Sequence, residues 1–343
     1  MEFVTQGGGE YALPWAVMLR PYRGENFTSN SFSTKRQIII NKYNTSNTPI
    51  TNFHSTPNTE TMMTERPMIR SFSNPQVKEV VRLRTGKHRR RREHFLIDGV
   101  REISRAIVSN IVIVRVYLEQ EYFSKKTNNT NAEKDHLREL LQSLDQKQNC
   151  VWEVTPEVFP KMTFGERNEG VIAVAESPIR DLCDVTLPEN PLLCVLEGIE
   201  KPGNIGAVFR SADGAGLDAV IVAQPETDLF NPGTVRASLG TVFPMQSAVT
   251  SNKEVLAWLR TRSLQIVAAR CDGAVPHYLI DFTKPTVIVM GCESAGLSEQ
   301  WSAPDILGVK IPMLGLADSL NISNAAAILF YEARRQRDQL SEK

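Results

Sequence analysis

The sequence predicts an α/β protein in which a small α/β domain precedes a larger domain built on a parallel sheet. Its 343 residues exceed the roughly 100 to 200 residues of one ordinary domain. Short apolar runs alternate with amphipathic helical segments over residues 63–176, and again over residues 192–343. The runs of the second stretch are apolar almost throughout, which is typical of strands buried on both faces of a parallel sheet.

The composition excludes several classes of protein. Lys and Arg number 39, as do Asp and Glu, so a nucleic-acid-binding surface can only be a local patch. No apolar run approaches the ~20 residues that span a bilayer, so we expect no membrane-spanning helix. The five cysteines form no Cys-x-x-Cys pair and lie near no clustered histidines. We therefore expect neither a disulfide framework nor a metal site, no export signal, and a cytoplasmic protein.

Residues 1–62 are expected to be a disordered extension. Asn, Ser and Thr make up 20 of the 38 residues from 25 to 62, which leaves too little apolar surface to offset the entropy of ordering. Globular sequence begins abruptly near Met63. A start of translation at Met62 or Met63 would explain this change, so the sequence leaves open whether the extension belongs to the mature protein.

The first domain, residues 63–176, begins with a basic run. Residues 82–92 contain no acid and seven basic side chains, namely Arg82, Arg84, Lys87, Arg89, Arg90, Arg91 and Arg92. Such a run is either a solvated loop or a phosphate-binding patch. The rest of the domain predicts strands at 95–97, 111–118, 150–155 and 171–175, and helices at 100–107, 132–144 and 156–162. Residues 177–191, rich in proline and polar residues, are the expected linker.

The second domain, residues 192–343, carries the longest apolar strands. They are predicted at 192–198, 218–223, 264–269, 286–291 and 308–313, with helices at 205–216, 231–239, 252–262 and 321–338. In parallel sheets, ligands bind beyond the carboxyl ends of the strands. The loops after the strands are therefore where a functional site is expected.

Three of these segments hold unusual groups of residues. Asn204, Gly206 and Arg210 surround the start of one helix, Gly291 and Gly296 flank Glu293, and Ser319, Asn321 and Ser323 precede the last helix. The patterns are neither a dinucleotide fingerprint nor a Walker loop, because the required glycine and lysine positions are absent. Each polar residue alone could be a helix cap or an ion-pair partner. Together, the three segments favour a binding site.

These segments resemble a known family in order and spacing. Asn204-x-Gly206-x3-Arg210, Gly291-x-Glu293-x2-Gly296 and the run from Ile311 to Ser323 are similar to the three motifs of the SpoU/TrmH family of RNA ribose 2'-O-methyltransferases, in the SPOUT superfamily. The resemblance covers residues 192–338, and residues 75–175 are similar to the substrate-binding domain of many members. It implies a deep trefoil knot, S-adenosyl-L-methionine as cofactor and RNA as partner.

The resemblance also implies residue roles. Catalytic roles fall to Asn204, Arg210, Glu293, Ser319 and Asn321, while the main chain around Gly291, Ile311 and Leu320 would hold the cofactor. The basic run would then be the RNA reader, because ribose 2'-hydroxyls are alike in every RNA and a separate element has to select the molecule. This favours large-subunit ribosomal RNA over transfer RNA as substrate.

Three alternative functions remain open, and one assembly state is expected. The alternatives are a transfer RNA methyltransferase, an inactive RNA-binding scaffold, and a nucleotide-dependent oxidoreductase, which the absence of a glycine-rich turn after the first strand disfavours. The resemblance implies a homodimer. The carboxy-terminal helix supports a dimer because its apolar face is larger than one sheet face requires; this face comprises Ala326, Leu329, Phe330 and Ala333.

Overall fold

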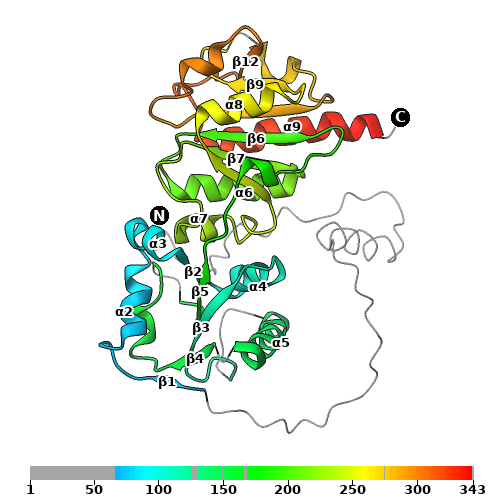
Figure 1. Ribbon diagram of the computed structural model, residues 1–343. Helices are drawn as coiled ribbons and strands as arrows, with labels where there is room; N and C mark the ends of the chain where they lie inside the picture. The colour runs from blue at the N-terminus through cyan, green and yellow to red at the C-terminus, as the bar shows by residue number, and fades with distance from the viewer. Residues whose placement is uncertain (1–65, 125–129, 149, 166–167, 274, 342–343) are drawn as a thin grey trace, which may run out of the picture. The chain divides into compact units, whose positions relative to one another are not determined.

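The computed structural model describes residues 66–124, 130–148, 150–165, 168–273 and 275–341 (Figure 1). The extension predicted for residues 1–62 lies outside these ranges. Within them, no helix combines the length and apolar character that crossing a membrane requires. The strands of the described residues form one five-stranded and one seven-stranded sheet.

The five-stranded sheet is mixed. Its order is β1 (Met68–Ile69), β4 (Val151–Val154), β3 (Ile113–Glu119), β5 (Val171–Glu176) and β2 (His94–Asp98), with β5 antiparallel to both neighbours. Alternate residues of β5 face opposite sides of the sheet. Ala173 packs with α4 (Val100–Val108) and α5 (Asn131–Gln148), whereas Ile172 packs with α2 (Pro75–Arg82) and the 3-10 turn η2 (Phe159–Lys161).

One predicted helix of this domain is wrong. Residues 156–162 form only the single 3-10 turn η2, flanked by turns. Pro160 lies inside this turn and has no backbone N–H to donate, so the segment cannot build a regular helix of two turns.

The seven-stranded sheet is parallel throughout. Its order is β10 (Val275–Pro276), β12 (Ile306–Lys310), β9 (Gln265–Ala269), β11 (Thr286–Met290), β6 (Leu192–Glu197), β7 (Ala219–Ala223) and β8 (Gln246–Thr250). The five predicted strands lie together inside the sheet. The two strands that were not predicted, β8 and β10, are its edges. Strand β10 has only two residues and β8 carries polar residues at both ends, so neither shows the apolar run that marks the others.

Helices cover both faces of this sheet. Cys194 of β6 packs in the cluster with α6 (Pro202–Ala215) and α9 (Ile322–Ser341), and the next residue, Val195, packs in the cluster with α8 (Asn252–Arg260). The apolar face of α9 that was expected to exceed the needs of the fold is fully buried in the first cluster. This correction removes the structural reason given for a dimer, because α9 uses that face inside its own chain.

The predicted linker is attached to the edge of the large sheet. Val249 N donates to Arg180 O at 2.9 Å, the Arg180 guanidinium donates to Phe243 O at 3.0 Å, and Thr186 N donates to Gln246 Oε1 at 2.9 Å. Residues 180–186 thus run beside β8. This segment partly covers the edge that β8 would otherwise expose.

One apolar cluster contains residues from both predicted domains. The ring of Phe95 in β2 lies 4.9 Å from that of Phe230 and 6.0 Å from that of Phe243, measured between centroids. Two arginines cross the same boundary, with Arg105 donating to Leu239 O at 2.7 Å and Arg236 to Phe164 O at 2.8 Å. The small sheet and the large sheet therefore share a continuous core.

Candidate active site

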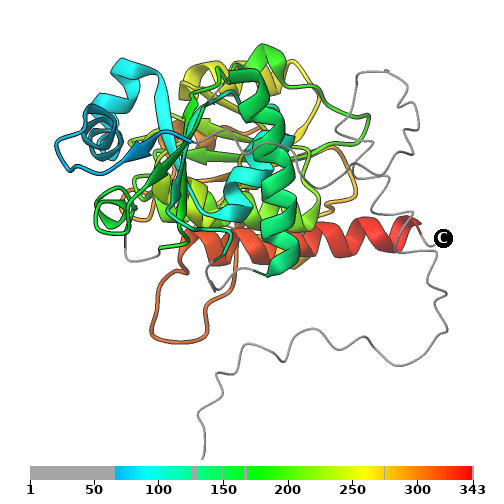
Figure 2. The same ribbon diagram turned by 90° about the horizontal axis from the view of Figure 1, so that it is seen from below.

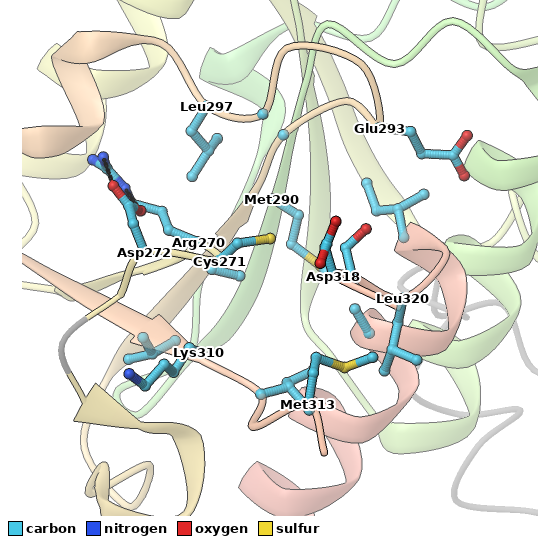
Figure 3. Close-up of a pocket in the computed structure, with 18 of the residues that line it drawn as sticks. Arg270, Cys271, Asp272, Met290, Glu293, Leu297, Lys310, Met313, Asp318 and Leu320 are labelled. Atoms are coloured by element: carbon cyan, nitrogen blue, oxygen red, sulfur yellow. Dashed lines mark hydrogen bonds and ion pairs between the residues drawn. The ribbon is translucent and has the colours of Figure 1, made fainter. Parts of the chain in front are cut away.

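A cavity of about 780 Å³ lies at the carboxyl edge of the large sheet (Figure 3). It is formed by the segments after β9, β11 and β12 and by the first turns of α9. All three predicted cofactor residues line it, namely Gly291, Ile311 and Leu320. Apolar side chains such as Met290, Leu297 and Met313 line it as well, together with a few charged ones. The pattern of a mostly apolar hollow with few polar groups is typical of small-molecule sites.

Gly291 closes the loop that follows β11. A Cβ atom at this position would collide with the main chain of Gly296 and lie 2.6 Å from Leu297 N, so only glycine fits. Gly296 N donates to Cys292 O at 3.0 Å, and Gly296 has a φ of 68°. The two glycines of this motif therefore build one tight turn at the cavity.

Gly206 positions the start of α6. A Cβ atom there would lie 2.7 Å from Ala237 Cβ and 2.8 Å from Ser238 N, both at the end of α7 (Pro232–Ala237). The glycine thus allows α6 and α7 to pack closely, and it fixes the first turn of α6, which carries Asn204. This packing explains why the first motif contains a glycine inside a helix despite its cost in helix propensity.

Glu293 joins three segments that are far apart in the sequence. Its Oε1 accepts a hydrogen bond from Asn204 Nδ2 at 2.9 Å and another from Asn321 Nδ2 at 2.6 Å. Its Oε2 pairs with Lys201 Nζ at 2.5 Å. Asn321 also caps α9, since its Oδ1 accepts from Ser323 N at 2.9 Å. The structure therefore brings together three of the five predicted catalytic residues.

Glu293 is held as a carboxylate. The hydrogen bond from Lys201 is the largest cause that lowers the pKa of Glu293, and the one from Asn204 lowers it further, while partial burial opposes both. An ionised carboxylate with three donors around it orients those donors and does not supply a proton. Figure 3 shows the side chain of Glu293 directed away from the middle of the cavity.

The other two predicted catalytic residues lie elsewhere. Ser319 lines the cavity but belongs to the exposed segment before α9. Arg210 lies about two turns into α6, with an exposed side chain, and makes no hydrogen bond or ion pair with the described residues. Arg210 lines neither this cavity nor a second, smaller cavity formed by the segments after β6 and β11. Its charge is therefore available to a ligand that approaches from outside.

The predicted RNA-binding run ends α2 and forms α3 (Gly86–Arg92). Five of its seven basic side chains are exposed, namely Arg82, Lys87, Arg90, Arg91 and Arg92. The other two require a correction. Arg89 is 4% exposed, and its side chain donates to both carboxylate oxygens of Asp228 and to two backbone carbonyls. Arg84 donates to the carbonyls of Lys161 and Thr163. Both guanidinium groups bind protein; Arg89 is buried and not presented to RNA, whereas Arg84 is half-buried.

Sequence reasoning missed several residues around the cavity. Lys201 stands directly before the first motif, and its place next to a helix start was the only available signal. Arg270, Asp272 and Lys310 line the cavity from the segments after β9 and β12. Arg270 and Asp272 follow the strand predicted at 264–269, where a site was expected in general, but only the order of strands in the sheet makes these segments neighbours.

Comparisons with known families agree with this geometry. Residues 191–331 match the SpoU rRNA Methylase family, and residues 74–173 match the MRM3-like substrate binding domain. The chain therefore has the two components that the motifs and the basic run separately indicated.

Individual relatives match over most of the chain. A 23S rRNA (uridine(2479)-2'-O)-methyltransferase of Streptomyces viridochromogenes is 36% identical over 259 residues, covering 73% of this chain and 85% of its own. The crystal structure of the SpoU methyltransferase AviRb from the same organism, in complex with AdoMet, is 30% identical, with a TM-score of 0.67 over 78% of this chain and all of that one. The tRNA (guanosine(18)-2'-O)-methyltransferase of Escherichia coli is 33% identical but covers only 46% of this chain. The protein belongs to the SpoU methyltransferase family.

Proposed function

We propose that the protein transfers a methyl group from S-adenosyl-L-methionine to a ribose 2'-hydroxyl of large-subunit ribosomal RNA. One observation carries this proposal. In a chain of the SpoU family, the cavity at the carboxyl edge of the sheet borders the cluster in which Asn204 and Asn321 converge on Glu293.

The cavity fits the cofactor in size and lining. Its volume of about 780 Å³ lies in the range of roughly 300 to 1,000 Å³ that small-molecule sites occupy. The main chain of Gly291 with the side chains of Ile311 and Leu320 suits the adenosine part. Lys310 and Asp272 also line the cavity, and a cation and a carboxylate can pair with the carboxylate and the ammonium group of the methionine part.

The assigned residues meet the needs of methyl transfer. The bound cofactor would supply an electrophilic methyl group, and the protein has to align the hydroxyl and stabilise negative charge on its oxygen. Arg210 provides that cation. A guanidinium stays protonated in proteins, so Arg210 is not the general base, and an adjacent RNA phosphate can relay the proton. Asn204, Glu293 and Asn321 fix the neighbouring segments, and Ser319 completes the pocket.

Ribosomal RNA is favoured over transfer RNA by the first domain. The Streptomyces ribosomal RNA enzyme aligns over 73% of this chain, whereas the transfer RNA enzyme aligns over 46%. Only the first alignment is long enough to include the substrate-binding domain together with the catalytic domain. A reader outside the catalytic domain is what selects one RNA among many.

The experiment that tests the function has two parts. Isothermal titration should show binding of S-adenosyl-L-methionine and not of NAD. Mapping 2'-O-methyl positions in total RNA from cells with and without the gene should show one lost mark in large-subunit ribosomal RNA. A lost mark confined to a transfer RNA would overturn the substrate, and binding of neither ligand would leave the scaffold alternative.

Replacing Arg90, Arg91 and Arg92 with alanine together should weaken RNA binding without changing cofactor affinity. Helix α3 is connected through Arg89 to Asp228, which follows β7 at the same edge of the sheet as the cavity. Each lost phosphate contact lowers the slope of log affinity against log salt by about 0.7 to 0.9, so the slope should fall by about 2 to 3. Filter binding over a salt series measures it.

The matched control is Arg89→Ala. Removing one partner of a buried ion pair costs about 3 to 5 kcal/mol, so this variant should lose thermal stability. A triple variant with the wild-type salt slope would show that α3 is not the RNA surface.

We also propose a homodimer, on grounds other than those the sequence suggested. Leu314 and Leu316 are 99% and 104% exposed on the loop before α9, which projects from the body in Figure 2. Ile328 and Tyr331 of α9 are exposed as well. Exposed apolar side chains on the loop and on α9 support an interface there. A monomer in sedimentation equilibrium at micromolar concentration would contradict the dimer.

The domain boundaries, the knot and the cellular location are also proposals. We infer an RNA-binding domain at 63–176, a linker at 177–191, a methyltransferase domain at 192–343 with a deep trefoil knot, and a cytoplasmic location. Family membership supports the knot and the two domains. An experimental structure whose carboxy-terminal segment passes through no loop would contradict the knot.

A further inference from the structure

A second, smaller cavity adjoins the proposed cofactor cavity. Its volume is about 190 Å³, and it is formed by the segments after β6 and β11. Cys292, Glu293 and Ile322 line both cavities, so the two are direct neighbours. A volume below the roughly 300 Å³ of small-molecule pockets suits one part of a nucleotide and not a second cofactor. A methyl donor and its acceptor have to be held side by side, and the small cavity is where the acceptor can enter.

Lys201 is the only cation among the residues that line the small cavity, which also include the carboxylates of Glu200 and Glu293. Its side chain is 67% exposed, and it forms an ion pair with Glu293 Oε2. An ammonium group has three N–H donors, so this pair leaves others for a ligand. An exposed pair of this kind contributes little to stability. Fold stability therefore gives no reason for a lysine at this position.

The charge of Lys201 is directed by Glu293. The carboxylate holds Lys201 Nζ on one oxygen while Asn204 and Asn321 occupy the other. The carboxylate thus places the ammonium group at the rim of the cavity. Arg210 lines neither cavity and is available to a ligand from outside, whereas Lys201 lines the small cavity itself.

We propose that Lys201 binds a backbone phosphate of the target nucleotide and so positions the ribose beside the methyl donor. The proposal rests on the proposed function, because it assigns the small cavity to the RNA acceptor. Lys201 acts in binding, whereas Arg210 acts on the charge that develops in the reaction. Loss of Lys201 should therefore raise KM for RNA, and loss of Arg210 should lower kcat.

The test uses Lys201→Met, Lys201→Arg and the control Lys253→Met in the full chain. Lys253 is exposed in the first turn of α8, at the same edge of the sheet, and lines neither cavity. With large-subunit ribosomal RNA transcribed in vitro, Lys201→Met should raise KM about tenfold, as expected for a hydrogen bond to a charged group, and kcat should change little. The salt slope of binding should fall by about 0.7 to 0.9. Lys201→Arg should restore both values.

Two outcomes would overturn the proposal. The first is a wild-type KM and salt slope in Lys201→Met, and the second is an equal change of both in Lys253→Met. The salt slope needs RNA binding but no methyl transfer, so it still tests Lys201 if the wild-type protein fails to methylate this RNA. A failure of the proposed function is seen separately, in the wild-type protein, as absence of cofactor binding or of methyl transfer.

Discussion

Replacing Gly291 with alanine is expected to abolish binding of S-adenosyl-L-methionine. An added Cβ would collide with the main chain of Gly296 and approach Leu297 N to 2.6 Å. These are backbone atoms and cannot turn aside as a flexible side chain would. The loop after β11 would have to open, and this loop lines the cofactor cavity with its main chain. Isothermal titration should detect no binding at cofactor concentrations about a hundredfold above the wild-type Kd, a loss of more than about 2.7 kcal/mol.

The matched control for this variant is Gly315→Ala. Gly315 lies in the loop before α9, where an added Cβ meets nothing within 4 Å and φ is outside the left-handed region. Cofactor affinity should stay within about twofold of wild type, because a surface substitution without strain changes the free energy by no more than about 0.5 kcal/mol. Retained binding in Gly291→Ala would show that the loop tolerates the shift and that the cavity does not depend on this turn.

The central strands β6, β7 and β11 were predictable because each is an apolar run that is buried throughout. The edges were not, since Gln246–Thr250 and Val275–Pro276 carry polar residues or are too short to form a pattern. The order of the strands in the sheet could not be predicted from the sequence either. Strand β11 pairs with β6 although about 90 residues separate them, and this pairing is what makes the loops after them neighbours.

The candidate site was predictable as a set of motifs but not as a geometry. Spacing picked out Asn204, Glu293 and Asn321, yet only the fold shows that the two amides meet on one carboxylate oxygen. For the basic run, the sequence pattern predicted the wrong surroundings for one residue. Arg89 is indistinguishable from its neighbours in the sequence, but its partner Asp228 lies 139 positions away and removes it from the surface. Charge patterns report composition, whereas exposure depends on contacts that are distant along the chain.

Replacing Arg210 with alanine is expected to abolish methyl transfer while fold and cofactor affinity remain. The side chain is exposed, makes no hydrogen bond or ion pair with the described residues, and lines neither cavity. Its removal therefore costs the folded state little. Losing a group that stabilises negative charge in the transition state lowers kcat by about 10² to 10³. Single-turnover methylation of ribosomal RNA, with cofactor affinity measured in parallel, checks this result.

Two further variants sharpen the assignment of Arg210. Arg210→Lys should also fail, because an ammonium group lacks the planar fork that can grip a phosphate and a developing alkoxide together. Arg260→Ala removes an exposed arginine of α8 that pairs with Asp305, and it should keep wild-type turnover. If Arg210→Ala turned over at nearly the wild-type rate, the cation for the alkoxide would have to come from another residue. Lys201 is then the next group to examine, since it lies at the rim of the acceptor cavity, and a fall in kcat for Lys201→Met would identify it.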